Sequence, residues 1–157
     1  MSQGNFILRE PEYEALLSIL RKLLTDASAK VVFLVDKNGT LVASVGDADG
    51  FDTTSLASLA AGNIAATGGL ANLIGENEFS ILFHEGERDN MHLSVVAERL
   101  ILVIVFDRRS SVGLVRLRVR QATRRLTEVM AAALAASDEE QGGVEELTEA
   151  DIESLFK

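Results

Sequence analysis

The sequence predicts an α+β fold in which an antiparallel sheet of five strands carries helices on its faces. Two hairpin signals support this prediction, Asn38-Gly39 between two β-branched runs and Ala97-Glu98-Arg99 between two apolar runs. A third observation is the uninterrupted apolar segment 100–106 (LILVIVF), which is typical of a central strand covered on both faces. Three helical patterns flank these strands, so the expected order is α-β-β-α-β-β-β-α.

The first half of the chain is expected to contain a helix, two strands and a second helix, over residues 11–26, 31–35, 41–45 and 53–75. Pro11 suits the first turn of the first helix, in which leucines recur at spacings of three and four. Thr53 or Thr54 is the expected N-cap of the second helix, and Gly75 its expected end.

The second half is expected to add three strands and a long helix, over residues 78–83, 91–96, 100–106 and 112–136. Phe79, Ile81 and Phe83 alternate along the first of these strands and therefore share one face. Ser110 or Ser111 is the expected cap of the last helix, whose apolar residues recur in alternating steps of three and four.

The helix expected over 53–75 has no charged residue, and twelve of its 23 residues are Ala, Gly or Ser. One of its faces suits a core and contains Leu56, Leu59, Ala60, Thr67, Leu70 and Ile74. The opposite face is small and uncharged, with Ser58, Ala61, Ala65, Gly69 and Asn72. Since an exposed helix face normally carries Lys or Glu, we expect a second subunit or a partner to pack closely here. A helix buried by its own domain is the alternative.

The composition narrows the class of protein. The chain has 157 residues, of which 47% are apolar, and a single proline, as expected of one globular domain. It has no cysteine, which excludes disulfides and zinc-thiolate sites. No segment reads as a signal peptide or as a membrane span, so a cytoplasmic protein is expected.

The acidic charge is concentrated at the C-terminus. Residues 137–157 contain eight acids and one Lys, whereas residues 1–136 contain sixteen acids and fourteen bases. We therefore expect a domain over 1–136, an acidic linker over 137–147 and a short amphipathic helix over 148–157. Thr148 is its expected N-cap. Three apolar residues of this tail share a face that would dock on its own domain or in a partner's groove: Ile152, Leu155 and Phe156.

Motifs for catalysis and for metal binding are absent. The sequence contains no P-loop, GxGxxG, HExxH or GxSxG, so the chain is not expected to be an enzyme or to hold a cofactor. His84 and His92 are too few for a metal site, and solvated loop histidines are the simpler interpretation. The loop with Asp47 and Asp49 lacks the glycine and the late glutamate of a calcium loop. No metal site is therefore predicted.

Seven arginines and no acid lie between residues 108 and 127. Arg116, Arg120 and Arg124 form one helical ridge, which a solvated face or an acidic partner explains better than nucleic acid does, because no aromatic residue is nearby to stack a base. Arg108 and Arg109 follow the central strand, where an inserted arginine finger is a minor option.

Three stretches resemble the roadblock/dynein light chain family, and more narrowly its bacterial polarity-regulator branch, the MglB-type proteins. They are KVVFLVDKNGTLVAS, TTSLASLAAGNIAATGGLANLIGENEF and LILVIVFDRRSSVGLVRLRVR. The likeness extends over residues 9–136, and the ending DIESLF is also similar to that branch.

The resemblance implies a homodimer joined through strand 78–83, with Phe79, Ile81 and Phe83 at the interface. It also implies a GTPase-activating protein for an MglA-type, Ras-like GTPase in cell polarity or motility, with two regulator subunits per GTPase and a cell pole as a candidate location. The implied platform is formed by small residues of the second helix: Ala57, Ser58, Ala61, Ala65 and Gly69. The expected mechanism is positional, acting on the GTPase's own catalytic residues. The alternatives are a non-activating scaffold subunit of a signalling or motor assembly, and a small-ligand sensor.

Overall fold

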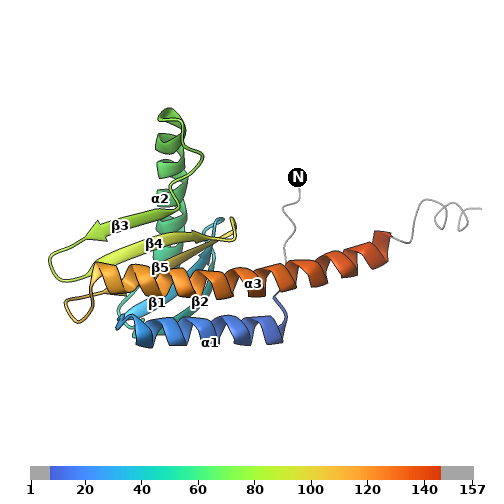
Figure 1. The fold of residues 1–157 in the computed structure, drawn as a ribbon, viewed down its shortest axis with the longest axis horizontal. Helices are drawn as coiled ribbons and strands as arrows, with labels where there is room; N and C mark the ends of the chain where they lie inside the picture. The colour runs from blue at the N-terminus through green and yellow to red at the C-terminus, as the bar shows by residue number, and fades with distance from the viewer. Residues whose placement is uncertain (1–7, 146–157) are drawn as a thin grey trace, which may run out of the picture.

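The computed structural model describes residues 8–145, with side chains as far as Ala136, and it confirms the predicted element order. The described residues form one five-stranded antiparallel sheet and three helices, whose arrangement Figure 1 shows. The elements are α1 Glu10–Asp26, β1 Val31–Asp36, β2 Leu41–Gly46, α2 Thr53–Leu73, β3 Ile81–Glu85, β4 Asn90–Val96, β5 Leu100–Phe106 and α3 Val112–Glu145. Among these helices, none is long and apolar enough to cross a membrane.

The strand order is β2-β1-β5-β4-β3, so β5 lies at the centre of the sheet, between β1 and β4. The register of β1 and β5 pairs Val31 with Val105 and Asp36 with Leu100. Every residue of β5 is buried, which confirms the prediction from its continuous apolar run. The strand at one edge is β2 and the strand at the other is β3, which pairs only with β4.

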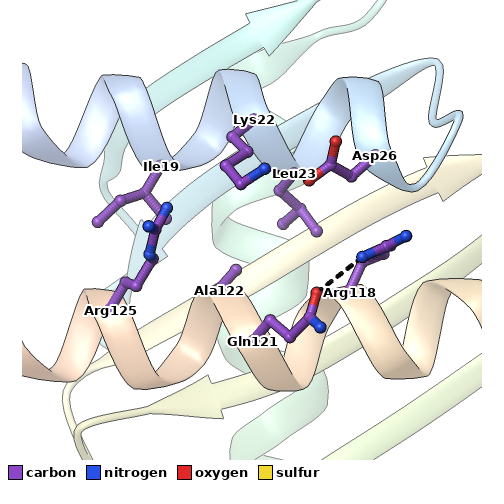
Figure 2. A pocket seen from close by; sticks show the side chains of 8 residues that line it. All are labelled: Ile19, Lys22, Leu23, Asp26, Arg118, Gln121, Ala122 and Arg125. Carbon is purple, nitrogen blue, oxygen red and sulfur yellow. Dashed lines mark hydrogen bonds and ion pairs between the residues drawn. The ribbon is translucent and has the colours of Figure 1, made fainter.

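Two helices cover one face of the sheet and one helix covers the other. In Figure 1, α1 and α3 run side by side, whereas α2 lies on the opposite face and crosses the strands. A groove of about 360 Å³ lies between α1 and α3, and Figure 2 shows the side chains that line it. There the ammonium group of Lys22 donates to Asp26 at 2.8 Å, and Arg125 of α3 lines the same groove.

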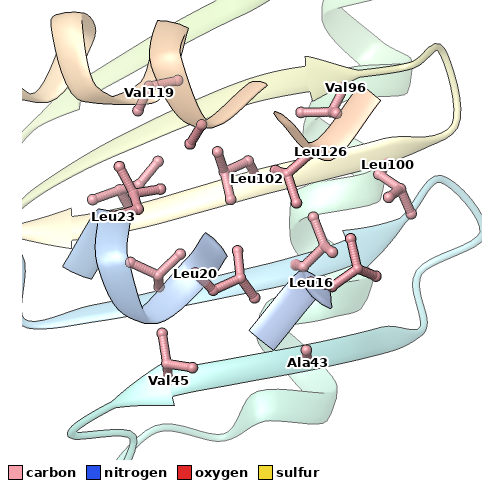
Figure 3. Close-up of a cluster of buried hydrophobic side chains, with 14 of the residues drawn as sticks. Leu16, Leu20, Leu23, Ala43, Val45, Val96, Leu100, Leu102, Val119 and Leu126 are labelled. Carbon is pink, nitrogen blue, oxygen red and sulfur yellow. The ribbon is translucent and has the colours of Figure 1, made fainter. Parts of the chain in front are cut away.

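Large aliphatic side chains form the core beneath α1 and α3 (Figure 3). Leu16, Leu20 and Leu23 of α1 are buried at the spacing of one helical face. They meet side chains of the sheet and of α3, among them Val96, Leu100, Leu102, Val119 and Leu126. Burial of such a side chain contributes about 1.5–3 kcal/mol, so this cluster is a main source of stability.

The N-terminus of α2 differs from its predicted form. The helix is capped by Asp52, not by Thr53 or Thr54, because the Asp52 carboxylate accepts from the backbone N–H of Ser55 at 3.1 Å and from its hydroxyl at 2.7 Å. These hydrogen bonds lower the pKa of Asp52. Gly75 follows the helix end with a positive φ of 83°, a conformation that favours glycine.

The last helix is longer than predicted. α3 continues to Glu145 and thus occupies most of the segment expected to be an acidic linker, 137–147. Glu, Gln and Ala are good helix formers, so an acidic composition by itself does not end a helix. The predicted tail helix over 148–157 lies outside the described residues, as do Ile152, Leu155 and Phe156. The tail helix stays a prediction.

Candidate functional site

The small residues of α2 divide between its buried and exposed sides. Ala57 and Ala61 are 1% and 9% exposed and contact the sheet, so these two predicted platform residues are covered by their own domain. Ser58, Ala65 and Gly69 are exposed. Part of the close packing predicted for the small uncharged residues is therefore with the sheet of the same chain.

The large apolar residues of α2 point outward. Leu59, Leu70, Leu73 and Ile74 are exposed by 72%, 59%, 82% and 69%. The prediction that Leu59, Leu70 and Ile74 enter the core is wrong. Apolar residues occur all around this helix, so their spacing did not single out one side. The buried side is instead formed by four alanines and one isoleucine, namely Ala57, Ala60, Ala61, Ala71 and Ile64.

Small residues face the sheet here because the sheet side chains are large. Phe33 of β1 is fully buried under α2, with Val31 and Val35 beside it. At the β1–β2 turn, a Cβ on Gly39 would lie 3.3 Å from the Cα of Ser58. The helix backbone therefore lies close to the domain, and its bulky side chains are left for the other side.

The exposed side of α2 is an uncharged surface with open space above it. A Cβ on Gly62, Gly68 or Gly69 would meet nothing within 4 Å. We call the outward residues of this helix the α2 surface: Ser58, Leu59, Gly62, Ala65, Ala66, Gly69, Leu70, Leu73 and Ile74. Contiguous exposed apolar surface without charge is typical of an interaction site.

The edge strand β3 begins later than predicted. It starts at Ile81 and not at residue 78, so Phe79 lies before the strand. The ammonium group of Lys37 donates to Glu78 at 2.9 Å, which connects the segment before β3 to the β1–β2 turn. Phe83 is half-buried and stacks on Phe106, with ring centroids 6.2 Å apart. Of the three predicted interface residues, only Ile81 is as much as 50% exposed.

A side-chain contact connects α2 with β3. The amide nitrogen of Asn63 and Nε2 of His84 lie 2.9 Å apart. Ala65 and Gly69 line a cleft of about 580 Å³ between α2 and the segment before β3, and Glu78 lies on its far side. The α2 surface and the β3 edge are thus neighbouring parts of one face.

The two histidines are on different sides of the sheet. His84 contacts α2, whereas His92 is a buried residue of β4 that lines a cavity beneath α3. The interpretation of His92 as a solvated loop residue is wrong. Its place in the predicted strand 91–96, two residues from Ser94, was the signal that both polar side chains share a face. Within residues 8–136, no three potential ligands gather as a metal site would require.

Arg108 and Arg109 are exposed in the loop after β5. Arg109 makes a two-pronged contact with Asp107, with both N–O distances at 3.1 Å, and this contact lowers the pKa of the Asp107 carboxyl. Both arginines lie near Lys30, at the opposite end of β1 from Lys37, which borders the α2 cleft. An arginine finger beside the α2 surface is therefore not favoured.

Comparisons with known proteins agree with this geometry. The model of the Roadblock/LC7 domain matches residues 16–106. The structure of Myxococcus xanthus MglB is 51% identical, with a TM-score of 0.77 over 81% of this chain and 96% of that one. The gliding protein MglB from Thermus thermophilus is 31% identical, with a TM-score of 0.75 over the same shares.

A structure described as MglB with tetrameric arrangement is 30% identical, with a TM-score of 0.77 over 83% of this chain and 98% of that one. Among curated proteins, none matches this chain. The family model matches more than half of the sequence, and the three MglB structures cover 81–83% of this chain. The chain therefore belongs to the Roadblock/LC7 family, in its MglB branch.

Proposed function

We propose that this protein is a homodimeric GTPase-activating protein for a small Ras-like GTPase of the MglA type, active in cell polarity or motility. The observation that supports this most is the α2 surface, which presents four large apolar side chains and no charge. A helix of a finished monomer would expose Lys or Glu here. The similarity to a gliding protein supports the assignment to motility.

The dimer would form through β3 of each protomer. An edge strand has unpaired backbone groups on one side, and Ile81 adds an exposed apolar side chain to it. Pairing of two β3 strands would bring the two α2 helices to one face, because Asn63 and His84 connect α2 to β3. Sedimentation is expected to give twice the 16.9 kDa chain mass, and Ile81→Lys to shift it towards the monomer. A purely monomeric wild type would contradict the dimer.

Activation would be positional. The paired α2 surfaces would hold the GTPase in the conformation in which its own catalytic residues face the γ-phosphate. A partner shifts a conformational equilibrium only by its differential affinity, so a hundredfold stimulation requires about 2.7 kcal/mol of preference for that conformation. Arg109 is already paired with Asp107, so Arg108→Ala and Arg109→Ala are expected to leave most of the stimulation in place.

The direct test places a charge on the α2 surface. Gly69→Arg and Ala65→Arg add a long cation where open space surrounds the helix, so the fold is expected to survive. Docking would bury that charge without a partner, which costs several kcal/mol. Stimulated GTP hydrolysis by an MglA-type GTPase is therefore expected to fall at least tenfold.

Ala131→Arg on the exposed side of α3 is the matched control, and it is expected to retain full stimulation. Wild-type activity is also expected to saturate at two regulator chains per GTPase. If Gly69→Arg stimulates hydrolysis as the control does, the α2 surface is not the GTPase platform. Binding without stimulation by the wild type would favour the alternative, a non-activating scaffold subunit.

A further inference from the structure

The face of the sheet beneath α3 contains a cavity to which the proposed function assigns no ligand, and Ile81 at its border belongs to the proposed dimer interface. It measures about 490 Å³ and lies between α3 and strands β3 and β4. His92 and Ser94 of β4 line it, and Ile81 of β3 pairs with Ser94 in register. Val119 of α3 lines the opposite side.

The two polar side chains of β4 in this cavity are buried without a partner. His92 is 0% and Ser94 4% exposed, and both ring nitrogens of His92 and the Ser94 hydroxyl lack a hydrogen bond within the described part of the chain. Buried polar groups in native proteins are nearly always hydrogen-bonded. Two such side chains pointing into one cavity indicate that something polar occupies it.

The cavity is also rich in positive charge. Arg116, Arg120 and Arg124 occur at every fourth position of α3 and line it, and no carboxylate does so among residues 8–136. None of the three has an ion pair or hydrogen bond within that described range. Like charges four residues apart on a helix repel one another, so a bound anion would stabilise the ridge.

The other side of α3 provides a contrast. Arg118 and Arg125 line the groove towards α1, where Asp26 supplies an acid (Figure 2). Lys22 is the main cause of the lowered pKa of Asp26, and both arginines lower it further. Arginines on that side are therefore partly neutralised by the chain itself, whereas those above His92 are not.

We propose that the cavity between β4 and α3 binds an oxyanion, the phosphate group of a small phosphorylated ligand, with His92 and Ser94 as its floor and the three arginines as its rim. Guanidinium groups match phosphate oxygens in a two-pronged geometry, and the hydroxyl and imidazole N–H supply further donors. The volume exceeds that of a phosphate alone and lies in the usual range of small-molecule sites.

Occupation by water alone is the competing explanation, because a polar cavity of this size also holds water. The two explanations differ in their response to anions. Burial and the charge of Arg116 lower the pKa of His92 to about 4. A bound phosphate would offset both effects, so the pKa of His92 would rise on binding, whereas water would leave it unchanged.

The test is a titration of the full-length protein with inorganic phosphate at constant ionic strength, with chloride as the balancing anion. NMR signals of the His92 ring and of the β4 amides report binding. We expect saturable shifts in this region, a raised pKa of His92, and binding by acetate at least tenfold weaker than by phosphate, because acetate offers fewer oxygens. Absence of saturable shifts would leave a hydrated cavity and overturn the proposal.

Substitutions on the two sides of α3 test whether phosphate binds on the side that faces β4. Arg120→Ala removes an exposed side chain of the rim, so the fold should be kept, and phosphate affinity is expected to fall about tenfold. Ser94→Ala is expected to weaken binding as well. Arg125→Ala is the matched control on the α1 side and should leave affinity unchanged. Equal losses in Arg120→Ala and Arg125→Ala would indicate unspecific attraction and overturn the proposal. The assay contains no GTPase, so its outcome is independent of the proposed activation.

Discussion

The two faces of the sheet are covered by helices of opposite design. On one face, α1 and α3 direct large aliphatic side chains inward and charged ones outward. On the other, α2 directs alanines inward and exposes Leu59, Leu70, Leu73 and Ile74. The aliphatic core of the first face is closed by side chains of one chain. The second keeps its bulky apolar groups on the outside, an arrangement that becomes favourable only when another molecule covers them.

The largest effect on stability is expected in the core beneath α1 and α3. Leu20 is fully buried there, so Leu20→Ala should lower the free energy of unfolding by about 2–5 kcal/mol. Leu73→Ala on α2 removes the same atoms from a side chain that is 82% exposed. This substitution should change the free energy of unfolding of the monomer by less than about 0.5 kcal/mol. Urea denaturation measures both. Similar losses in the two variants would remove the distinction between the faces.

A pH titration probes His92, a buried ionisable side chain beneath α3. The pKa of His92 is lowered from 6.5 to about 4 by burial and by Arg116, so the folded state binds its proton less readily than the unfolded state. The free energy of unfolding should be unaffected above pH 6.5 and fall by up to about 3 kcal/mol as the pH drops to 4. Denaturation in phosphate-free buffer measures this loss. The His92→Leu variant should not show this loss of stability between pH 6.5 and 4, although the pH dependence that arises from carboxyl groups should remain.

Enlarging an alanine of α2 should have different effects on the side of the helix that packs on the sheet and on its exposed side. Ala57 is 1% exposed against Phe33 and its neighbours, so Ala57→Leu should overfill the contact and cost about 1–3 kcal/mol. Ala66→Leu on the exposed side is the control, with an expected change below about 0.5 kcal/mol. Thermal denaturation compares them. A stable Ala57→Leu would mean that α2 does not lie tightly on the sheet.

Most of the fold follows from local patterns. The hairpin turns, the apolar run of β5 and the periodic leucines of α1 each specify their element by themselves, and the order of elements follows from them. The start of β3 does not follow from a local pattern, because Phe79 continues the alternation of apolar residues ahead of the strand. The pairing of Ile81 with Ser94 determines where the strand begins.

The candidate site was harder to predict than the fold. The orientation of α2 depends on the size of the sheet side chains beneath it, which helical periodicity alone cannot represent. Of the predicted platform residues, Ser58, Ala65 and Gly69 are exposed, whereas Ala57 and Ala61 are buried against the sheet. The cavity at His92 is lined by two strands and by a helix distant from them in the sequence. The sequence therefore indicates the row of arginines on this helix, but not that His92 and Ser94 lie beneath it.

The central pairing of β1 with β5 has a consequence for biosynthesis. Residue 31 pairs with residue 105, so the sheet closes only after some seventy further residues have been made. At a synthesis rate of about 5–20 residues per second, the first hairpin waits roughly 3–15 s for its central neighbour. During that interval the inner edge of β1 is unpaired, and α2 has no finished sheet to cover. Closure of such long-range contacts is slow, so the nascent chain is most vulnerable to aggregation before β5 emerges.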